Sequence, residues 1–173
     1  MIPNHRTTAV ILLLTIIFVL VSSCGQRDQK PISPGESPPE NIDGRLDFLN
    51  PDGEILITIT IEIANTFETQ RKGLMDRRTL SLMHGMLFIF DKVEPKSFWM
   101  RNTHIPLDII FIDDQNTVIK IDENTEPFSE NSHRSILPVK YVVEVNAGFN
   151  KRFGIGKGIR IQWQPASSKS KIP

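Results

Sequence analysis

The sequence offers almost nothing for covalent cross-linking and has no excess of charge of either sign. Cys24 is its only cysteine, so no disulfide can form within the chain and the fold depends on its apolar core. Basic and acidic residues number 20 each, which gives no electrostatic basis for binding nucleic acid, and we expect no nucleic-acid partner. The longest apolar run, residues 9–21, would span roughly 20 Å as a helix, less than the ~30 Å hydrocarbon core of a bilayer.

Motifs of the common enzyme classes are also missing. The chain has no GxSxG nucleophile elbow, no GxxxxGK[ST] phosphate loop, no GxGxxG dinucleotide fingerprint and no HExxH zinc motif. The glycine-rich stretch at residues 154–158 lies between an expected helical turn and an expected strand, so it lacks the context of a phosphate loop. We therefore expect no cofactor and no metal site, and we favour a protein without catalytic activity.

The N-terminus has the pattern of a bacterial lipoprotein signal. A short, weakly basic segment precedes the apolar run, and the run ends in Val21-Ser22-Ser23-Cys24, which resembles a lipobox. The pattern predicts that residues 1–23 are a signal peptide and that Cys24 is acylated, so that its lipid anchors the chain to a membrane of the cell envelope. Gly25 is not the aspartate associated with inner-membrane retention in enteric bacteria, so we expect the outer membrane if the source has two membranes.

Three regions are expected after the signal. Residues 24–44 hold the cysteine and then four prolines and three glycines, which predicts a flexible tether. Residues 45–164 form the expected folded domain. The polar residues 165–173 are expected to be a disordered tail.

The folded region has patterns typical of strands. Residues 54–63 place isoleucine at every second position, the period of a half-buried strand. Further strands are expected at residues 85–90, 97–101, 107–113, 117–122, 139–146 and 158–163. A short helix is expected at residues 65–72, with Asn65 as its N-cap, Glu68 completing a capping box and Gly73 after its end, and a helical turn at residues 149–153. The expected fold class is mainly β: a compact, antiparallel-rich, β-barrel-like domain with one or two short helices.

Several short motifs in a fixed order resemble the domain-of-unknown-function 192 family. They are Arg71-Lys72-Gly73-Leu74-Met75, Arg77, Gly85-Met86-Leu87-Phe88, Phe98-Trp99-Met100-Arg101-Asn102-Thr103, Pro106-Leu107-Asp108, Tyr141-Val142-Val143-Glu144 and Gly148. The resemblance implies a small, mainly β, barrel-like domain that is often exported, and it implies no established activity. Members of that family often carry a cysteine pair where this chain has residues 126–134 without cysteine, so no role of that pair is transferred here.

Polar residues in these motifs are the candidates for a ligand-binding site. They are Arg71, Trp99, Arg101, Asn102, Asp108 and Glu144. Asp108 alternates onto the side of Ile110 and Ile112, so its carboxylate must be paired or lie at a strand end. Either it orients a polar ligand beside Trp99, or it accepts hydrogen bonds from backbone amides of the adjacent loop. The second interpretation is favoured, with Trp99 and Arg71 lining any site that exists.

Glu144 presents a similar choice, since it lies between Val143 and Val145 in an apolar strand. One interpretation is a carboxyl group that faces a ligand and has a raised pKa. The other, which is favoured, is the buried partner of Arg71 or Arg77, because buried charges are usually compensated.

Sulfur and imidazole side chains raise the question of copper. The residues concerned are Met75, Met83, Met86, Met100, His84 and His104. Thioether and imidazole ligands suit Cu(I), but methionine commonly fills gaps in small cores, so packing is favoured. His133 is expected to be an exposed histidine in a polar loop.

These patterns favour a membrane-tethered domain of the cell envelope that binds a small molecule or an envelope-protein partner without catalysis. The first alternative is a hydrolase or transferase that uses Asp108, Glu144 and Arg71, and the second is copper handling in the envelope. Geometry tests the enzyme alternative. Convergence of the three residues in an open pocket favours an enzyme or a ligand-binding site, and pairing inside the wall excludes the enzyme.

Overall fold

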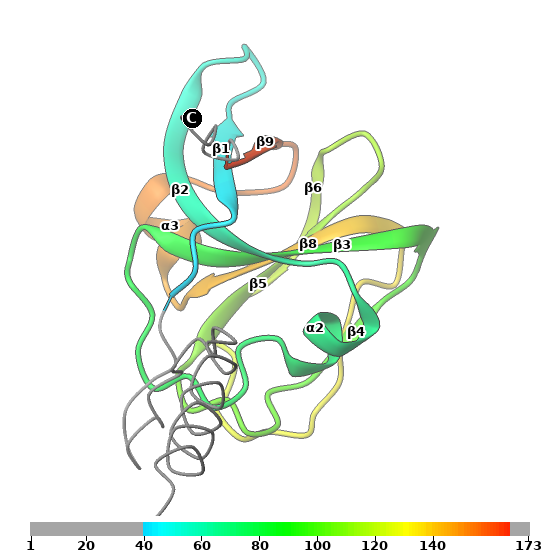
Figure 1. Ribbon diagram of the computed structural model, residues 1–173. Coiled ribbons are helices and arrows are strands. Elements are labelled where there is room, and N and C mark those ends of the chain that lie inside the picture. The colour runs from blue at the N-terminus through cyan, green and yellow to red at the C-terminus, as the bar shows by residue number, and fades with distance from the viewer. Residues whose placement is uncertain (1–39, 167–173) are drawn as a thin grey trace, which may run out of the picture. The chain divides into compact units, whose positions relative to one another are not determined.

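The computed structural model describes residues 40–166, and within them it has nine strands and two short helices (Figure 1). They are β1 (Gly44–Leu49), β2 (Ile55–Ala64), α2 (Phe67–Lys72), β3 (His84–Glu94), β4 (Ser97–Phe98), β5 (Leu107–Ile112), β6 (Val118–Asp122), β7 (His133–Arg134), β8 (Val139–Asn146), α3 (Phe149–Phe153) and β9 (Arg160–Pro165). The expected mainly β class with two short helices is confirmed. The predicted signal peptide, Cys24, most of the tether and most of the tail lie outside the described residues.

Seven of these strands form one mixed sheet in the order β6-β5-β8-β3-β2-β1-β9, and β4 pairs with β7 in a small second sheet. Every pair in the large sheet is antiparallel except β2 with β3. Its two edges approach each other at a single bridge between Thr117 and Arg160, and the Val118 amide donates to the Ile159 carbonyl at 2.8 Å. The sheet is therefore antiparallel-rich and curled, but it is not closed into a barrel.

The central strands β3, β5 and β8 are buried on both faces, so successive side chains enter two different apolar cores. The first core contains Leu87, Ile110, Val143, Val145 and Phe149, together with Leu46 and Phe48 of β1. The second core contains Met86, Phe88, Ile109, Phe111 and Val142, together with Leu74 and Met100. Membership of one core or the other fixes the sheet face toward which each polar residue of these strands points.

Strands β2 and β3 are parallel, and parallel neighbours need a long crossover between them. Helix α2 is part of this crossover, which contributes Leu74 and Leu80 to the second core. The N-cap of the helix lies one residue later than expected. Its N-cap is Thr66, which accepts a hydrogen bond from the Thr69 amide at 3.2 Å, while Thr69 Oγ1 accepts from the Thr66 amide at 3.0 Å. The predicted Asn65–Glu68 capping box is therefore wrong, and the Thr66–Thr69 pair takes its place.

Two strands were not predicted, and one predicted strand is shorter than expected. The strands that were not predicted are β1, which pairs with both β2 and β9, and β7, which pairs with β4 through two residues of each strand. The expected strand at residues 97–101 ends at Phe98, because the Met100 amide donates to the Ser129 carbonyl and Asn102 turns the chain with a φ of 56°. Across residues 40–166, no helix has the length and apolar character needed to cross a bilayer.

Candidate functional site

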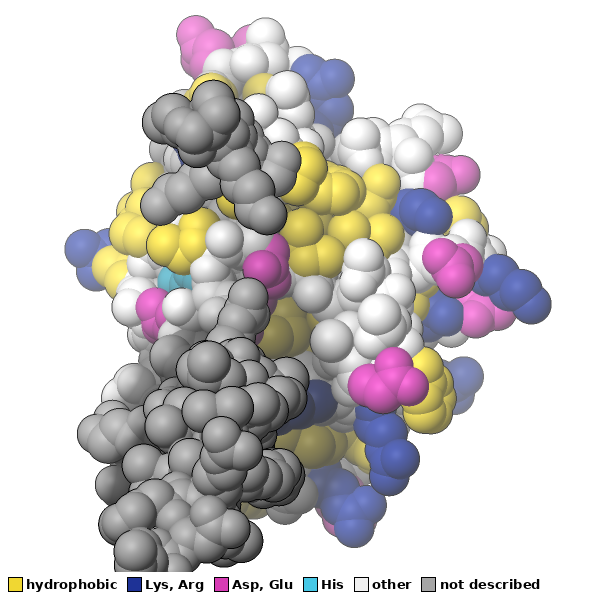
Figure 2. All heavy atoms as spheres, viewed as in Figure 1, with side chains coloured by type: hydrophobic (Ala, Val, Ile, Leu, Met, Phe, Trp, Pro, Cys, Tyr) yellow, Lys and Arg dark blue, Asp and Glu magenta, His cyan; other side chains and the backbone are white. Residues whose placement is uncertain are grey.

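A pocket of about 250 Å³ opens on the second-core side, between α2 and the chain that follows β3. We call it the α2–β4 pocket. It is lined by Phe67, Gln70, Arg71, Lys72, Gly73, Leu74, Met75, Phe88, Phe90, Lys96, Ser97, Phe98, Trp99, Thr103 and Glu144. Lys and Arg side chains gather on the side of the molecule where α2 and β4 lie (Figure 2). The pocket is thus apolar within and bordered by basic groups.

Glu144 supplies the only carboxyl group of the lining, and it is 5% exposed. It stands opposite Met86 of β3 and Ile109 of β5 in the sheet register, both of which belong to the second core. Its side chain consequently points toward α2, away from Val143 and Val145. Among residues 40–166, no hydrogen bond or ion pair reaches its carboxyl oxygens.

Burial without a compensating partner raises the pKa of Glu144 from 4.5 to about 8, because desolvation disfavours the charged form. At neutral pH this side chain is mostly an uncharged carboxylic acid, which can donate one hydrogen bond and accept another. A buried carboxyl group with free hydrogen-bonding capacity at the base of a pocket is an arrangement suited to holding a ligand.

Gly73 keeps the base of the pocket open. It follows α2 with φ 47° and ψ −136°, a conformation that residues with a Cβ rarely adopt. A Cβ at this position would lie 3.2 Å from Phe88 Cζ and 3.9 Å from Glu144 Oε2. The glycine predicted to end the helix therefore also leaves the space above the carboxyl group empty.

Aromatic side chains form the walls of the pocket. The ring of Phe98 packs edge-on against Phe88, with centroids 5.0 Å apart, and against Phe90, with centroids 6.3 Å apart. Such pairs hold the rings in fixed orientations. At the mouth, Trp99 is 50% exposed and Phe67 is 74% exposed. Trp99 therefore has the exposure expected of a residue at a pocket entrance rather than of a core aromatic.

Basic residues border the mouth. Arg71 and Lys72 are exposed in the last turn of α2, and neither has an ion pair within the described part of the chain. Lys96 already forms an ion pair and a cation–π contact, since its Nζ lies 2.6 Å from Glu94 Oε1 and 4.5 Å from the centre of the Phe90 ring. Arg101 is not part of the lining, and its exposed guanidinium lies 5.9 Å from the Trp99 ring and 3.5 Å from Glu130.

Asp108 lies on the opposite face of the sheet from Glu144. Its neighbours Ile110 and Ile112 belong to the first core, and it is fully buried. Its two oxygens accept hydrogen bonds from the backbone amides of Asn124 at 2.9 Å and Asn150 at 3.2 Å. Asp108 therefore accepts hydrogen bonds from backbone amides, as the favoured interpretation expected, but the donors are Asn124, after β6, and Asn150, in α3, and not the adjacent loop at residues 102–106. Asp108, Glu144 and Arg71 do not converge as the enzyme alternative requires.

Residues 48–163 match the sequence model of one family, DUF192, whose description is "Uncharacterized ACR". The chain belongs to the DUF192 family. A comparison with curated proteins found no match.

Two solved structures resemble the DUF192 domain described above. One, from Sinorhizobium meliloti 1021, is described as a "putative transcription regulator"; it is 38% identical, with a TM-score of 0.67, over 72% of this chain and 98% of that chain. The other, from Novosphingobium aromaticivorans DSM 12444, is described as a protein of unknown function. It is 35% identical, with a TM-score of 0.65, over 69% of this chain and 84% of that chain.

Asp108→Asn is expected to lower the stability of the DUF192 domain by about 1–3 kcal/mol, because the introduced NH₂ group would face a backbone N–H that loses its acceptor. The same substitution should leave binding in the α2–β4 pocket unchanged, since Asp108 lies on the other face. Urea denaturation measures the first effect. A urea unfolding curve that matches that of the wild type would contradict the structural role.

The expected ion pair between Glu144 and Arg77 is wrong. In the DUF192 domain Arg77 is 5% exposed and its guanidinium binds Glu62, which is 8% exposed. His84 completes this cluster, with Nε2 3.2 Å from the same Glu62 oxygen and Nδ1 2.7 Å from Thr60 Oγ1. The sequence did not predict this pair, because Glu62 alternates with isoleucines in the pattern of a half-buried strand, which places it on the face opposite the isoleucines. Arg71, the other proposed partner of Glu144, lines the same pocket as Glu144 without forming an ion pair.

The remaining candidate residues lie in several places. Met86 and Met100 are buried in the second core, and the Met100 sulfur accepts a hydrogen bond from Thr125 at 3.1 Å. Asn102 forms a turn, and its carbonyl accepts from the Asp76 amide at 2.8 Å. Within residues 40–166, no three His, Cys, Asp or Glu side chains are placed to share a metal ion.

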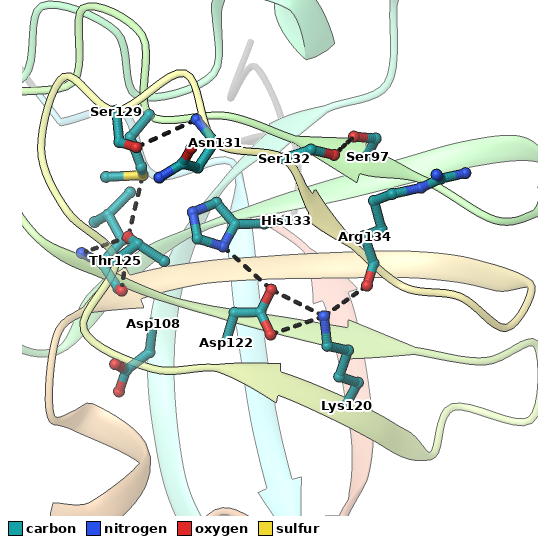
Figure 3. Close-up of polar contacts among 12 residues, drawn as sticks. Ser97, Asp108, Lys120, Asp122, Thr125, Ser129, Asn131, Ser132, His133 and Arg134 are labelled. Atoms are coloured by element: carbon teal, nitrogen blue, oxygen red, sulfur yellow. Dashed lines mark hydrogen bonds and ion pairs between the residues drawn. The ribbon is translucent and has the colours of Figure 1, made fainter.

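His133 is not the exposed loop residue that was expected. It belongs to β7, its side chain is 19% exposed, and its Nδ1 lies 3.2 Å from Asp122 Oδ2. Lys120 Nζ contacts the same carboxylate at 2.8 Å and donates to the Arg134 carbonyl at 2.6 Å (Figure 3). These contacts link the small β4–β7 sheet to β6, and the close-up shows Asp108 directed away from them.

Proposed function

We propose that this chain is a lipid-anchored protein of the cell envelope whose DUF192 domain binds a small organic ligand in the α2–β4 pocket without transforming it. The observation that supports binding is Glu144, a buried carboxyl group with no partner in the described part of the chain, at the base of an aromatic pocket. The pocket lining holds no histidine or cysteine, and Ser97 Oγ forms a hydrogen bond with Ser132 Oγ at 2.7 Å. A nucleophile with an adjacent base is therefore missing from the lining, which favours binding over catalysis.

Ligand binding is tested by identifying the small molecules that the protein carries. The full chain is purified in mild detergent and denatured, and the released compounds are identified by mass spectrometry against a detergent blank. We expect a compound that Trp99→Ala loses. Phe128→Ala is the matched control, because Phe128 is a similarly exposed aromatic that does not line the pocket. The proposal fails if no compound is released, or if the Trp99 variant retains it in the same amount.

The lipid anchor rests on Val21-Ser22-Ser23-Cys24 and on the apolar run before it. Cys24→Ser is expected to abolish acylation and to leave the precursor unprocessed, because the thiol is the group that is alkylated. Metabolic labelling with a fatty-acid probe, followed by fractionation of the membranes, measures both effects. Label retained by the Cys24→Ser variant would exclude this anchor, and the fractionation also tests the proposed outer-membrane location.

A further inference from the structure

The charges around the α2–β4 pocket favour one sign of ligand. Three cationic side chains line it, Arg71, Lys72 and Lys96, against one carboxyl group, Glu144. Glu94 already neutralises Lys96, so Arg71 and Lys72 are the cations left for a ligand. The carboxylates Glu68 and Asp76 line an adjoining hollow that shares Arg71 and Lys72 with the pocket, and they are not part of the pocket itself.

The interior of the pocket favours a flat apolar group. Phe88, Phe90 and Phe98 form its wall, and Trp99 stands half-exposed at its mouth. An engineered protein cavity of about 150 Å³ holds one benzene molecule. A pocket of about 250 Å³ is therefore large enough for a two-ring body, or for one ring with substituents.

We propose, on the basis of the proposed function, that the ligand is an organic anion with an aromatic body. Its anionic group lies at the mouth, where Arg71 and Lys72 bind it, and its rings enter between the phenylalanines toward Glu144. The guanidinium of Arg71 can bind a carboxylate or a phosphate through two hydrogen bonds. Carboxylate, sulfonate and phosphate groups share the chemistry that this mouth recognises.

The charge state of Glu144 agrees with an anionic ligand. Because burial raises its pKa to about 8, Glu144 adds no negative charge to the pocket at pH 7 and can donate a hydrogen bond to the inner end of the ligand. To form an ion pair with Glu144, a cationic ligand would have to remove that proton, and it would also have to approach Arg71 and Lys72. Both requirements oppose its binding.

Three probes that share the naphthalene ring and carry substituents of different charge test this inference. They are 2-naphthoate (anion), 2-naphthylmethanol (neutral) and 2-naphthylmethylammonium (cation), and binding to the full chain is measured by calorimetry at pH 7. We expect the anion to bind about tenfold more tightly than the neutral probe, which corresponds to about 1.4 kcal/mol, and the cation to bind most weakly. Added salt should reduce the preference for the anion, because exposed charges are screened.

A double variant tests the role of the mouth. Arg71→Ala with Lys72→Ala should reduce the affinity for 2-naphthoate to that of the neutral probe. The matched control is Lys151→Ala with Arg152→Ala, which removes the same two residue types from the last turn of α3. The control should bind 2-naphthoate as the wild type does.

The outcomes separate this inference from the proposed function. A neutral or cationic probe that binds at least as tightly as 2-naphthoate, and that Trp99→Ala loses, overturns the anion preference while the pocket still binds a ligand. Equal loss in the two double variants overturns the role of Arg71 and Lys72. Binding of none of the probes also overturns the inference, and the proposed function falls with it only if the purified protein carries no compound.

Discussion

Replacing Glu144 by glutamine is expected to leave the stability of the folded domain nearly unchanged at pH 4 and to raise it by about 4–5 kcal/mol at pH 9. The reason is the buried position of Glu144, which raises its pKa from 4.5 to about 8. One pKa unit corresponds to about 1.4 kcal/mol. Glutamine has nearly the same shape and never ionises, so it removes this cost while keeping the hydrogen-bonding capacity.

The direction of the effect follows from proton binding. Between pH 4.5 and about 8 the unfolded chain has lost the Glu144 proton and the folded chain keeps it, so the wild type becomes less stable as the pH rises through this window. Above it both states are ionised and the loss is complete. The difference between wild type and variant isolates this group from other titrating residues.

Urea denaturation at pH 4, 6, 8 and 9 measures the effect. Glu130→Gln is the matched control, since the Glu130 side chain is 72% exposed and its loss should change stability equally little at every pH. A wild type and a Glu144→Gln variant whose stabilities stay parallel from pH 4 to pH 9 would show that Glu144 does not have a raised pKa.

Arg77→Met is expected to lower the free energy of unfolding by about 3–5 kcal/mol, because it leaves Glu62 buried without its cationic partner. Both residues are less than a tenth exposed, so solvent cannot fully replace the lost interaction. The matched control is Arg45→Met, which removes a 58%-exposed arginine whose ion pair with Asp47 is 3.9 Å long. That control should change stability by less than about 1 kcal/mol.

Removing both members of the buried pair should cost less than removing one. Arg77→Met combined with Glu62→Leu takes away the uncompensated charge and fills the site with apolar groups, so we expect it to recover most of the lost stability. A double variant as unstable as Arg77→Met alone would mean that the loss comes from packing around Arg77 and not from the charge left on Glu62.

Much of the large sheet could be predicted because its strands carry local signals. The alternating isoleucines of β2 and the apolar runs of β3, β5 and β8 each favour a strand by themselves. Strands β1 and β7 lack such a signal, because β1 has only two apolar residues that point inward, and β7 is two residues long. The parallel pairing of β2 with β3 is a property of the whole topology, which no single segment reveals.

The candidate site could be predicted only in part, for a similar reason. Trp99, Arg71 and Glu144 were candidates as individual residues, and the structure brings them to one pocket. Asp108 was a candidate for the same reason as Glu144, a carboxyl group in an apolar strand, yet it has two backbone donors, and Glu144 has none among the residues that the structure describes. Whether a buried carboxyl group receives hydrogen bonds depends on loops that are distant from it in sequence. The aromatic wall was missed because Phe88 and Phe90 have the pattern of core residues.

The state of the Glu144 carboxyl group is the most direct test of the central claim, that an uncharged acid forms the base of a ligand pocket. Carbon NMR of protein labelled at the glutamate carboxyl carbon follows each group through a pH titration, and Glu144→Gln assigns the resonance. We predict one resonance with a midpoint near 8, absent from the variant and displaced by saturating 2-naphthoate at pH 7. A Glu144 resonance that titrates near 4.5 and does not respond to the ligand would contradict the claim.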